Sequence, residues 1–223
     1  MEREEDKKIM KWKYNPPSLI KSIFSDFQWN SIVPKILITF DDGPNPNTTE
    51  IILNELDEHK IKSIFFCVGE NIEKYPNLAK EIISEGHEIG NHTFNHQIIT
   101  KQSVEEISKS IQLTQEIVKE NLNYEVKYFR PPHGRFDLRT KKILNQFQLQ
   151  SVMWSLLTYD YKNDLNIVKF ALAEYLRNDS IIVLHDSNKS KEIVVDSIKL
   201  ILEKSSKKDY QIGTPSECLK HYS

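Results

Sequence analysis

Short apolar, β-branched or aromatic runs alternate with amphipathic stretches of helical period from Lys35 onward. The runs predict seven strands, at residues 35–40, 62–68, 87–92, 126–132, 150–161, 180–186 and 210–215. Helices are predicted between them at residues 48–59, 77–84, 103–121, 138–148, 167–177 and 192–204. Ser103 and Glu106 have the spacing of a capping box at the start of the third helix. Alternating units of this kind predict an α/β fold with a parallel sheet, either open or closed as a barrel.

Residues 1–34 precede the repeated units and are predicted to be a charged leader and a packing segment. The apolar patch "SLIKSIFSDFQW" at residues 18–29 is expected to pack on the body as an extra element. The leader contains no apolar run of signal-peptide length. We therefore expect either a cytoplasmic protein or a chain whose leader has been trimmed, and the sequence does not separate the two.

Residues 35–223 are predicted to form a single domain, because 223 residues with 39% hydrophobic content suffice for one sizeable core. The 30 basic and 32 acidic residues give a net charge of −2, which provides no general attraction to nucleic acid or anionic membranes. No stretch reaches the roughly 18 uninterrupted apolar residues of a membrane-spanning helix. We expect a monomer whose substrate is held by a local site.

Two further patterns narrow the class of protein. Cys67 and Cys218 are too few and too far apart for a disulfide framework, and buried thiols are predicted instead. The chain has neither a G-x-G-x-x-G motif nor a P-loop, so nothing supports a nucleotide-binding sheet.

Polar residues gather at the predicted carboxyl ends of different strands. They are Asp41, Asp42, His92, Arg130, Asp160 and His185. In a β/α barrel the loops at that edge meet at one mouth, so these residues are predicted to form one cluster. Neighbouring side chains on a strand point to opposite faces, so one aspartate can bind a metal while the other faces substrate. The alternative is a polar strand exit capped by the turn-forming residues 43–46.

The segment "NHTFNH" places His92 and His96 four residues apart. If it is helical, both imidazoles project from one face and can reach one cation. The alternative is a chance pair on a solvated turn. With an aspartate from another strand end, the pair completes a two-histidine, one-carboxylate set whose open positions are typical of catalytic metals.

The segments "FRPPHG" and "IIVLHD" add a cation and a candidate proton donor. Arg130 is expected near the carboxylates, and the proline-rigid loop is expected to aim the backbone N–H of His133 into the cleft. The alternative is a simple loop corner. His185 ends an apolar strand, where it is either a satisfied rim residue or an acid whose pKa Asp160 raises.

These motifs, together with the segment from Trp154 to Asp160, occur in the order and approximate spacing of polysaccharide deacetylases of the NodB-homology type, carbohydrate esterase family 4. The chain resembles this family from about Lys35 to about Pro215. The resemblance implies a distorted (β/α)7 barrel in a single domain. It also implies a metal-dependent hydrolase that removes the acetyl group from N-acetylglucosamine-type residues of a peptidoglycan-like or chitin-like glycan and releases acetate.

The resemblance also implies roles for individual residues. Asp41 looks like the general base, oriented by Arg130, and His185 looks like the general acid, tuned by Asp160. The implied metal ligands are Asp42, His92 and His96. The implied metal is Zn²⁺, although the same donor set suits Fe²⁺, Co²⁺, Ni²⁺ or Mn²⁺. The implied substrate-binding positions are His133, Trp154, Val183 and Tyr161, of which Trp154 and Val183 resemble the walls of the acetyl pocket.

The chain departs from the family pattern in two motifs. Many members have D-x-x-D-W where this chain has Leu157 and Tyr161 in place of the first Asp and the Trp, and His133 stands where Tyr is common. Aromatic rings near the mouth, at Phe94, Phe136, Tyr159 and Tyr161, suit either sugar stacking or core packing. Alternative functions on the same fold are acetylxylan esterase, hydrolase of small cyclic amides, and a sugar-binding barrel without turnover.

Overall fold

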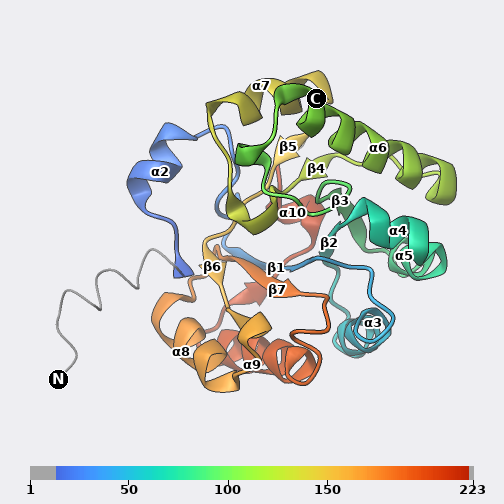
Figure 1. Ribbon diagram of the computed structural model, residues 1–223. Coiled ribbons are helices and arrows are strands. Elements are labelled where there is room, and N and C mark those ends of the chain that lie inside the picture. Colours follow the sequence, from blue (N-terminus) through green and yellow to red (C-terminus); the bar gives the residue numbers. More distant parts are fainter. Residues whose placement is uncertain (1–13, 221–223) are drawn as a thin grey trace.

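Residues 14–220 are described by a computed structural model, and their strands form a curled parallel sheet ringed by helices (Figure 1). Seven strands follow the order β5-β4-β3-β2-β1-β7-β6, and β8 pairs with the first residues of β1. The expected fold class, α/β with a distorted (β/α)7 barrel, is confirmed. The strands are β1 (Lys35–Asp41), β2 (Ile64–Cys67), β3 (Glu88–Asn91), β4 (Tyr128–Phe129), β5 (Gln150–Ser151), β6 (Leu156–Leu157), β7 (Ile181–His185) and β8 (Gln211–Ile212).

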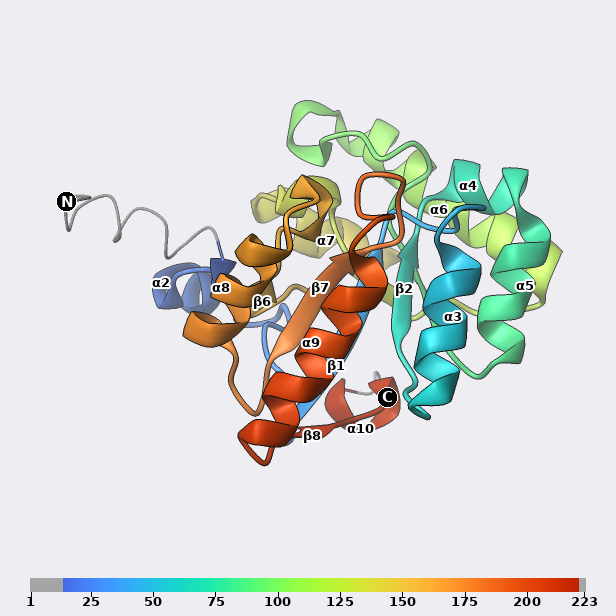
Figure 2. The same cartoon turned by 90° about the horizontal axis from the view of Figure 1, so that it is seen from below.

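The helices surround the sheet, and all six predicted helices are present within three residues of their expected bounds. The α-helices are α2 (Ser18–Ile23), α3 (Thr49–Glu58), α4 (Gly69–Lys74), α5 (Pro76–Ser84), α6 (Val104–Leu122), α7 (Leu138–Gln146), α8 (Leu165–Tyr175), α9 (Val194–Lys207) and α10 (Pro215–Cys218). Three short 3₁₀ turns are η1 (Ile99–Lys101), η2 (Pro132–Gly134) and η3 (Asp160–Lys162). In Figure 2, α10 and β8 lie at the amino end of β1. The site described below is at the other end.

One strand prediction is wrong. The run at residues 150–161 is not a single strand, because β5 pairs with β4 whereas β6 pairs with β7, at opposite edges of the sheet. Between them Met153 leaves the sheet and is buried against Phe27 and Trp29. An apolar run thus arises from two short strands and a core contact, which periodicity alone does not distinguish from one long strand.

The N-terminal segment fills the space between these two edges. Gln28 pairs with Val152 and Asn30 with Ser180 through isolated bridges. In the helix ring, α2 lies between α7 and α8, where no helix connects β5 to β6 (Figure 1). Residues 14–34 therefore pack on the barrel. The leader at 1–13 lies outside the described residues, and the division of the chain at residue 34 stays a prediction.

The two faces of β1 explain how the barrel carries both a core and a site. Ile36, Ile38 and Phe40 belong to the large apolar cluster that includes the surrounding helices. Leu37 belongs to a second cluster on the other face, so the next residues of the same parity, Thr39 and Asp41, also face the barrel interior. The alternation of β1 therefore ends with a carboxylate at the barrel mouth.

Two further expectations concern the cysteines and membrane insertion. Cys67 and Cys218 are both buried free thiols, as predicted. Within residues 14–220, no helix is both long enough and apolar enough to cross a bilayer.

The side chain of Gln28 connects three parts of the chain and provides a test of how the N-terminal segment is held on the barrel. Its amide donates to the Cys218 carbonyl at 2.7 Å and accepts from Gln150 Nε2 at 3.0 Å and from the Lys220 N–H at 2.9 Å. Gln28→Ala would leave these buried groups unpaired, so we expect the free energy of unfolding to fall by about 3 kcal/mol.

Urea denaturation followed by tryptophan fluorescence measures this effect. Gln146→Ala, on the exposed face of α7, is the matched control and should change stability by less than about 0.5 kcal/mol. Equal stability of the two variants would contradict the role given to Gln28.

Candidate active site

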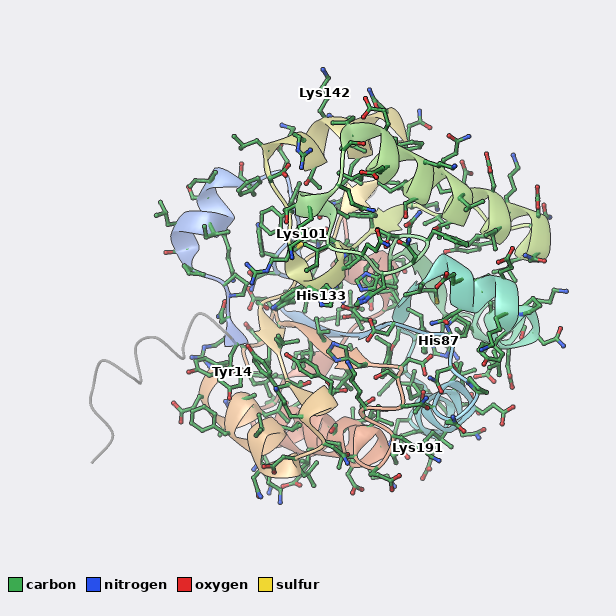
Figure 3. The ribbon with its side chains drawn as sticks, in the orientation of Figure 1. Tyr14, His87, Lys101, His133, Lys142 and Lys191 are labelled. Atoms are coloured by element: carbon green, nitrogen blue, oxygen red, sulfur yellow. The ribbon has the colours of Figure 1, made fainter. Side chains whose placement is uncertain are left out.

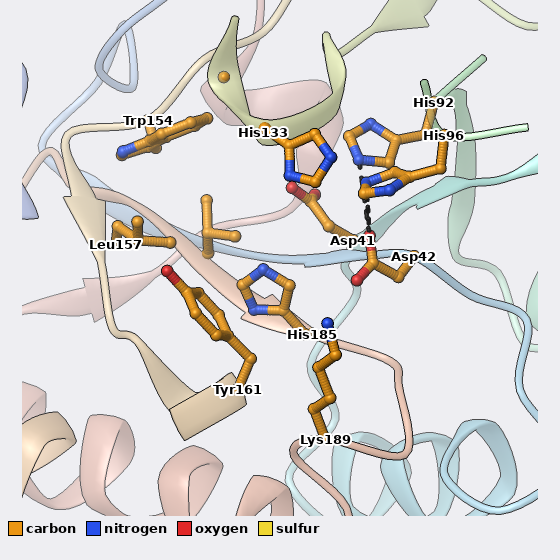
Figure 4. A pocket seen from close by; sticks show the side chains of 12 residues that line it. Asp41, Asp42, His92, His96, His133, Trp154, Leu157, Tyr161, His185 and Lys189 are labelled. Carbon is orange, nitrogen blue, oxygen red and sulfur yellow. Dashed lines mark ion pairs between the residues drawn. The ribbon is translucent and has the colours of Figure 1, made fainter. Parts of the chain in front are cut away.

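A cavity of about 210 Å³ opens at the carboxyl end of the strands, where loops from several strands meet (Figure 4). His133 marks its position at the centre of the helix ring (Figure 3). The cavity is lined by Asp41, Asp42, His92, His96, His133, Gly134, Trp154, Leu157, Tyr161, Val183, His185 and Lys189. Of the predicted site residues, only Arg130 and Asp160 are absent from this lining. Both are fully buried and contact lining residues from behind.

Asp41 and Arg130 form a buried ion pair beneath the cavity. Arg130 Nη1 lies 2.7 Å from Asp41 Oδ1 and also donates to Thr39 Oγ1 at 2.7 Å. The remaining guanidinium groups donate to the carbonyls of Val152 and Met153, both at 2.9 Å. Together these bonds fix the plane of the guanidinium. Arg130 holds one carboxylate oxygen of Asp41, and the other oxygen is available to the cavity.

Asp42, His92 and His96 form a second group beside this pair. Asp42 Oδ1 lies 3.1 Å from His96 Nε2 and 3.7 Å from His92 Nε2. The segment carrying the histidines is not helical, and His96 reaches Asp42 because its backbone adopts a positive φ of 56°. Asp42 also has a positive φ, 79°, which turns it away from β1. Such conformations are uncommon outside glycine and concentrate at functional sites.

The three residues fit a divalent cation. One ligand atom from each lies within 4.8 Å of the others, a spacing that one ion with bonds of about 2.1 Å bridges after small side-chain movements. His92 Nδ1 donates to the Arg130 carbonyl at 2.7 Å, which leaves Nε2 free as a ligand. Burial is the main cause that lowers the pKa of His92 to about 4, so the imidazole is neutral, as a metal ligand must be.

The charge of Asp42 is stabilised by its surroundings. Burial alone raises the pKa of Asp42, but the hydrogen bond from His96 and the charge of His185 outweigh it and hold that pKa well below its usual range. The two adjacent aspartates therefore have separate partners, Arg130 for Asp41 and histidines for Asp42.

His185 and Asp160 form the third pair. His185 Nδ1 lies 2.7 Å from Asp160 Oδ1, and the His185 backbone N–H donates to Asp160 Oδ2 at 2.7 Å. Burial lowers the pKa of His185, but the charge and hydrogen bond of Asp160, with the charges of Asp42 and Asp41, raise it to about 9. The imidazole is therefore a protonated group at neutral pH, held with its other nitrogen free of Asp160.

The remaining predicted residues form the walls of the cavity. His133, with a positive φ of 56°, has its ring 4.5 Å from that of His96, and Trp154, Val183 and Tyr161 also line the cavity. Trp154 is supported from behind by the cluster of Phe27, Trp29 and Met153. The use of the His133 backbone N–H stays a prediction. Of the aromatic rings predicted near the mouth, Tyr161 lines the cavity, and Phe94, Phe136 and Tyr159 pack against the core.

Sequence reasoning assigned no role to three polar residues of the site. Thr39 shares Arg130 with Asp41, and its signal was its position two residues before Asp41 on the same strand face. Lys189 lines the cavity from the loop after β7, and no local pattern distinguished it from a solvated lysine.

Asp186 is the third missed residue. Its carboxylate accepts hydrogen bonds from the Thr48 and Thr49 hydroxyls at 2.5 and 2.6 Å, and its N–H donates to the Asp41 carbonyl at 2.8 Å. Burial is the main cause that raises the pKa of Asp186 to about 7. Through these hydrogen bonds, Asp186 connects the segment after Asp42 to the end of β7.

Comparisons with known proteins identify the family of the chain. Residues 30–152 match the family model described as polysaccharide deacetylase. A peptidoglycan-N-acetylglucosamine deacetylase of Bacillus cereus is 40% identical over 128 residues, which cover 57% of this chain and 46% of that protein. A second Bacillus cereus protein of the same description is 32% identical over 193 residues, covering 83% of this chain and 88% of the relative.

The fold has close solved counterparts. The crystal structure of the Bc1960 peptidoglycan N-acetylglucosamine deacetylase, in complex with 4-naphthalen-1-yl-N-oxidanyl-benzamide, superposes with a TM-score of 0.82 at 29% identity. The match covers 89% of this chain and 95% of that one. The chain nevertheless spans less than half the length of the first curated relatives it matches, 46% and 38%. From the family match and the near full-length relative, the chain belongs to the polysaccharide deacetylase family, carbohydrate esterase family 4, with a NodB-homology domain.

Proposed function

We propose that this protein hydrolyses the N-acetyl group of N-acetylglucosamine-type residues in a cell-wall glycan, with a divalent cation held by Asp42, His92 and His96. Family membership and the peptidoglycan deacetylase descriptions of two relatives support the reaction and the substrate class. The observation that carries the proposal is that one cavity is lined by the cation ligands, by Asp41 and by His185. A sugar-binding barrel without turnover has no need of a matched acid and base.

The base is Asp41. A divalent cation in this site supplies Lewis-acid polarisation of the acyl carbonyl and acidifies water. The Asp41 carboxylate, held through Oδ1 by Arg130, takes a proton from the attacking water through its other oxygen. Because Arg130 makes four hydrogen bonds to fixed groups, the carboxylate is oriented before substrate arrives.

The acid is His185. Hydrolysis of an amide needs a proton on the departing nitrogen, and His185 is protonated at neutral pH because of Asp160. Asp160 accepts from both the ring and the backbone of His185, so the imidazole keeps one orientation. The acyl group is accommodated by Trp154 and Val183, and the His133 N–H stabilises the developing oxyanion by about 3 kcal/mol.

A substrate panel tests the proposed reaction. Acetate release is measured from chitooligosaccharides, peptidoglycan and acetylxylan, with defined divalent metals restored after chelation. We expect release from N-acetylated glycans with Zn²⁺ or a similar ion. Release from acetylxylan alone would favour an esterase, and metal loading without any release would favour a binding barrel.

Substitutions separate the base from the metal ligands. Asp41→Asn removes the base but none of the ligands, so we expect full metal occupancy with turnover reduced at least about 100-fold. The double variant His92→Ala/His96→Ala removes both nitrogen ligands, so we expect loss of both metal and turnover. Metal is quantified by inductively coupled plasma mass spectrometry after dialysis. Unchanged occupancy in the double variant would reject the ligand assignment.

The pH profile tests the role of Asp160. His185 must be protonated to act, so activity should decline as pH rises through about 9. Asp160→Asn removes the charge that raises this pKa, so the alkaline limb of kcat/KM should move down by at least about one pH unit, with the maximum reduced at least about 100-fold.

The control for this profile is Asp164→Asn. Asp164 is an exposed helix cap whose role asparagine also fills, so this variant should keep the wild-type profile. An unchanged alkaline limb in Asp160→Asn would contradict the assignment of His185 as the acid.

A further inference from the structure

Tyr161 presents a hydroxyl at the apolar end of the cavity. It lies on η3, directly after Asp160, and lines the cavity. Its ring packs edge-on against His185, with centroids 4.8 Å apart and planes at 77°, and lies 5.5 Å from the Tyr159 ring. In Figure 4 the hydroxyl is directed toward Leu157, away from Asp42. The packed ring fixes the position of the hydroxyl.

This hydroxyl makes no hydrogen bond to any residue in the range 14–220. Burial is the main cause that raises the pKa of Tyr161 to about 12, so the group is a protonated donor at every working pH. Its neighbours in the lining, Trp154, Leu157 and Val183, offer only apolar side-chain surface or an indole. A polar group in such a setting has hydrogen-bonding capacity that a bound molecule can satisfy.

The direction of the acyl group follows from the proposed function, on which this inference rests. The acyl carbon must lie where water activated by Asp41 can attack, and the amine must lie where His185 can protonate it. The third substituent of the acyl carbon then points to the remaining wall, where Trp154 and Leu157 lie (Figure 4) and where Val183 is the strand partner of Leu157. The Tyr161 hydroxyl lies at this wall.

We propose that Tyr161 hydrogen-bonds a hydroxyl on the acyl group, so that the site hydrolyses N-hydroxyacetyl as well as N-acetyl amino sugars. The hydroxyl of a hydroxyacetyl group is carried by the carbon that is a methyl in acetyl. In hydrolysis, water oxygen joins the acyl carbon, the C–N bond breaks, and a proton goes to nitrogen. Hydroxyacetate and the free amino sugar are released, and no further reactant is needed.

Three matched oligosaccharides test this assignment, with N-acetyl, N-hydroxyacetyl and N-propionyl groups. Hydroxyacetyl and propionyl have the same number of non-hydrogen atoms, so their comparison isolates the hydroxyl from size. We expect the metal-loaded wild type to hydrolyse the hydroxyacetyl substrate with a kcat/KM about tenfold above the propionyl substrate. In Tyr161→Phe this ratio should fall to about one.

Tyr75→Phe is the matched control. It removes a phenol at the junction of α4 and α5, outside the cavity, and should keep the wild-type ratio. A wild-type ratio near one would overturn the proposal. An equal loss on all three substrates in Tyr161→Phe would also overturn it, because the hydroxyl would then bind the sugar rather than the acyl group.

Binding provides a readout that does not depend on turnover. Calorimetry with the metal-loaded Asp41→Asn variant should give a hydroxyacetyl affinity about tenfold above the propionyl affinity, and adding Tyr161→Phe should remove the difference. Release of no acid by wild type, with this difference still present, would reject the proposed function but support the acyl assignment. Equal affinities would reject the acyl assignment.

Discussion

The buried pair of Arg130 and Asp41 is the interaction on which the site depends. A fully buried guanidinium is costly unless its donors are bonded, and here four of its five N–H groups reach Asp41, Thr39 and two backbone carbonyls, with the Phe66 ring 4.0 Å away. These bonds join β1, β4 and the chain after β5. The Arg130 guanidinium therefore stabilises the Asp41 carboxylate at the bottom of the cavity. The same group also connects the strands that position Asp41.

Much of the fold and of the candidate site could be predicted because the candidate catalytic residues lie at or just after strand ends. A parallel sheet brings its carboxyl ends together, so Asp41, Arg130 and His185 meet although they are far apart in sequence. The pairing of His185 with Asp160 was foreseen for the same reason. Strand alternation also places Val183 on the face of His185.

Other features depend on contacts that no local pattern records. Met153 is an apolar residue that packs on the N-terminal segment rather than in the sheet, so the sequence of residues 150–161 resembles one longer strand. His96 reaches Asp42 because its backbone has a positive φ, which the residue type does not predict. The bridging amide of Gln28 and the buried carboxylate of Asp186 acquire their partners only after distant segments have met.

We propose that Asp42, His92 and His96 bind one catalytic cation next to Asp41. Anomalous scattering from crystals grown with zinc measures this most directly, by comparing maps recorded above and below the zinc absorption edge. We expect one strong peak about 2.1 Å from an Asp42 carboxylate oxygen and from Nε2 of each histidine. A zinc peak elsewhere on the protein, with these three side chains bound to none, would contradict it.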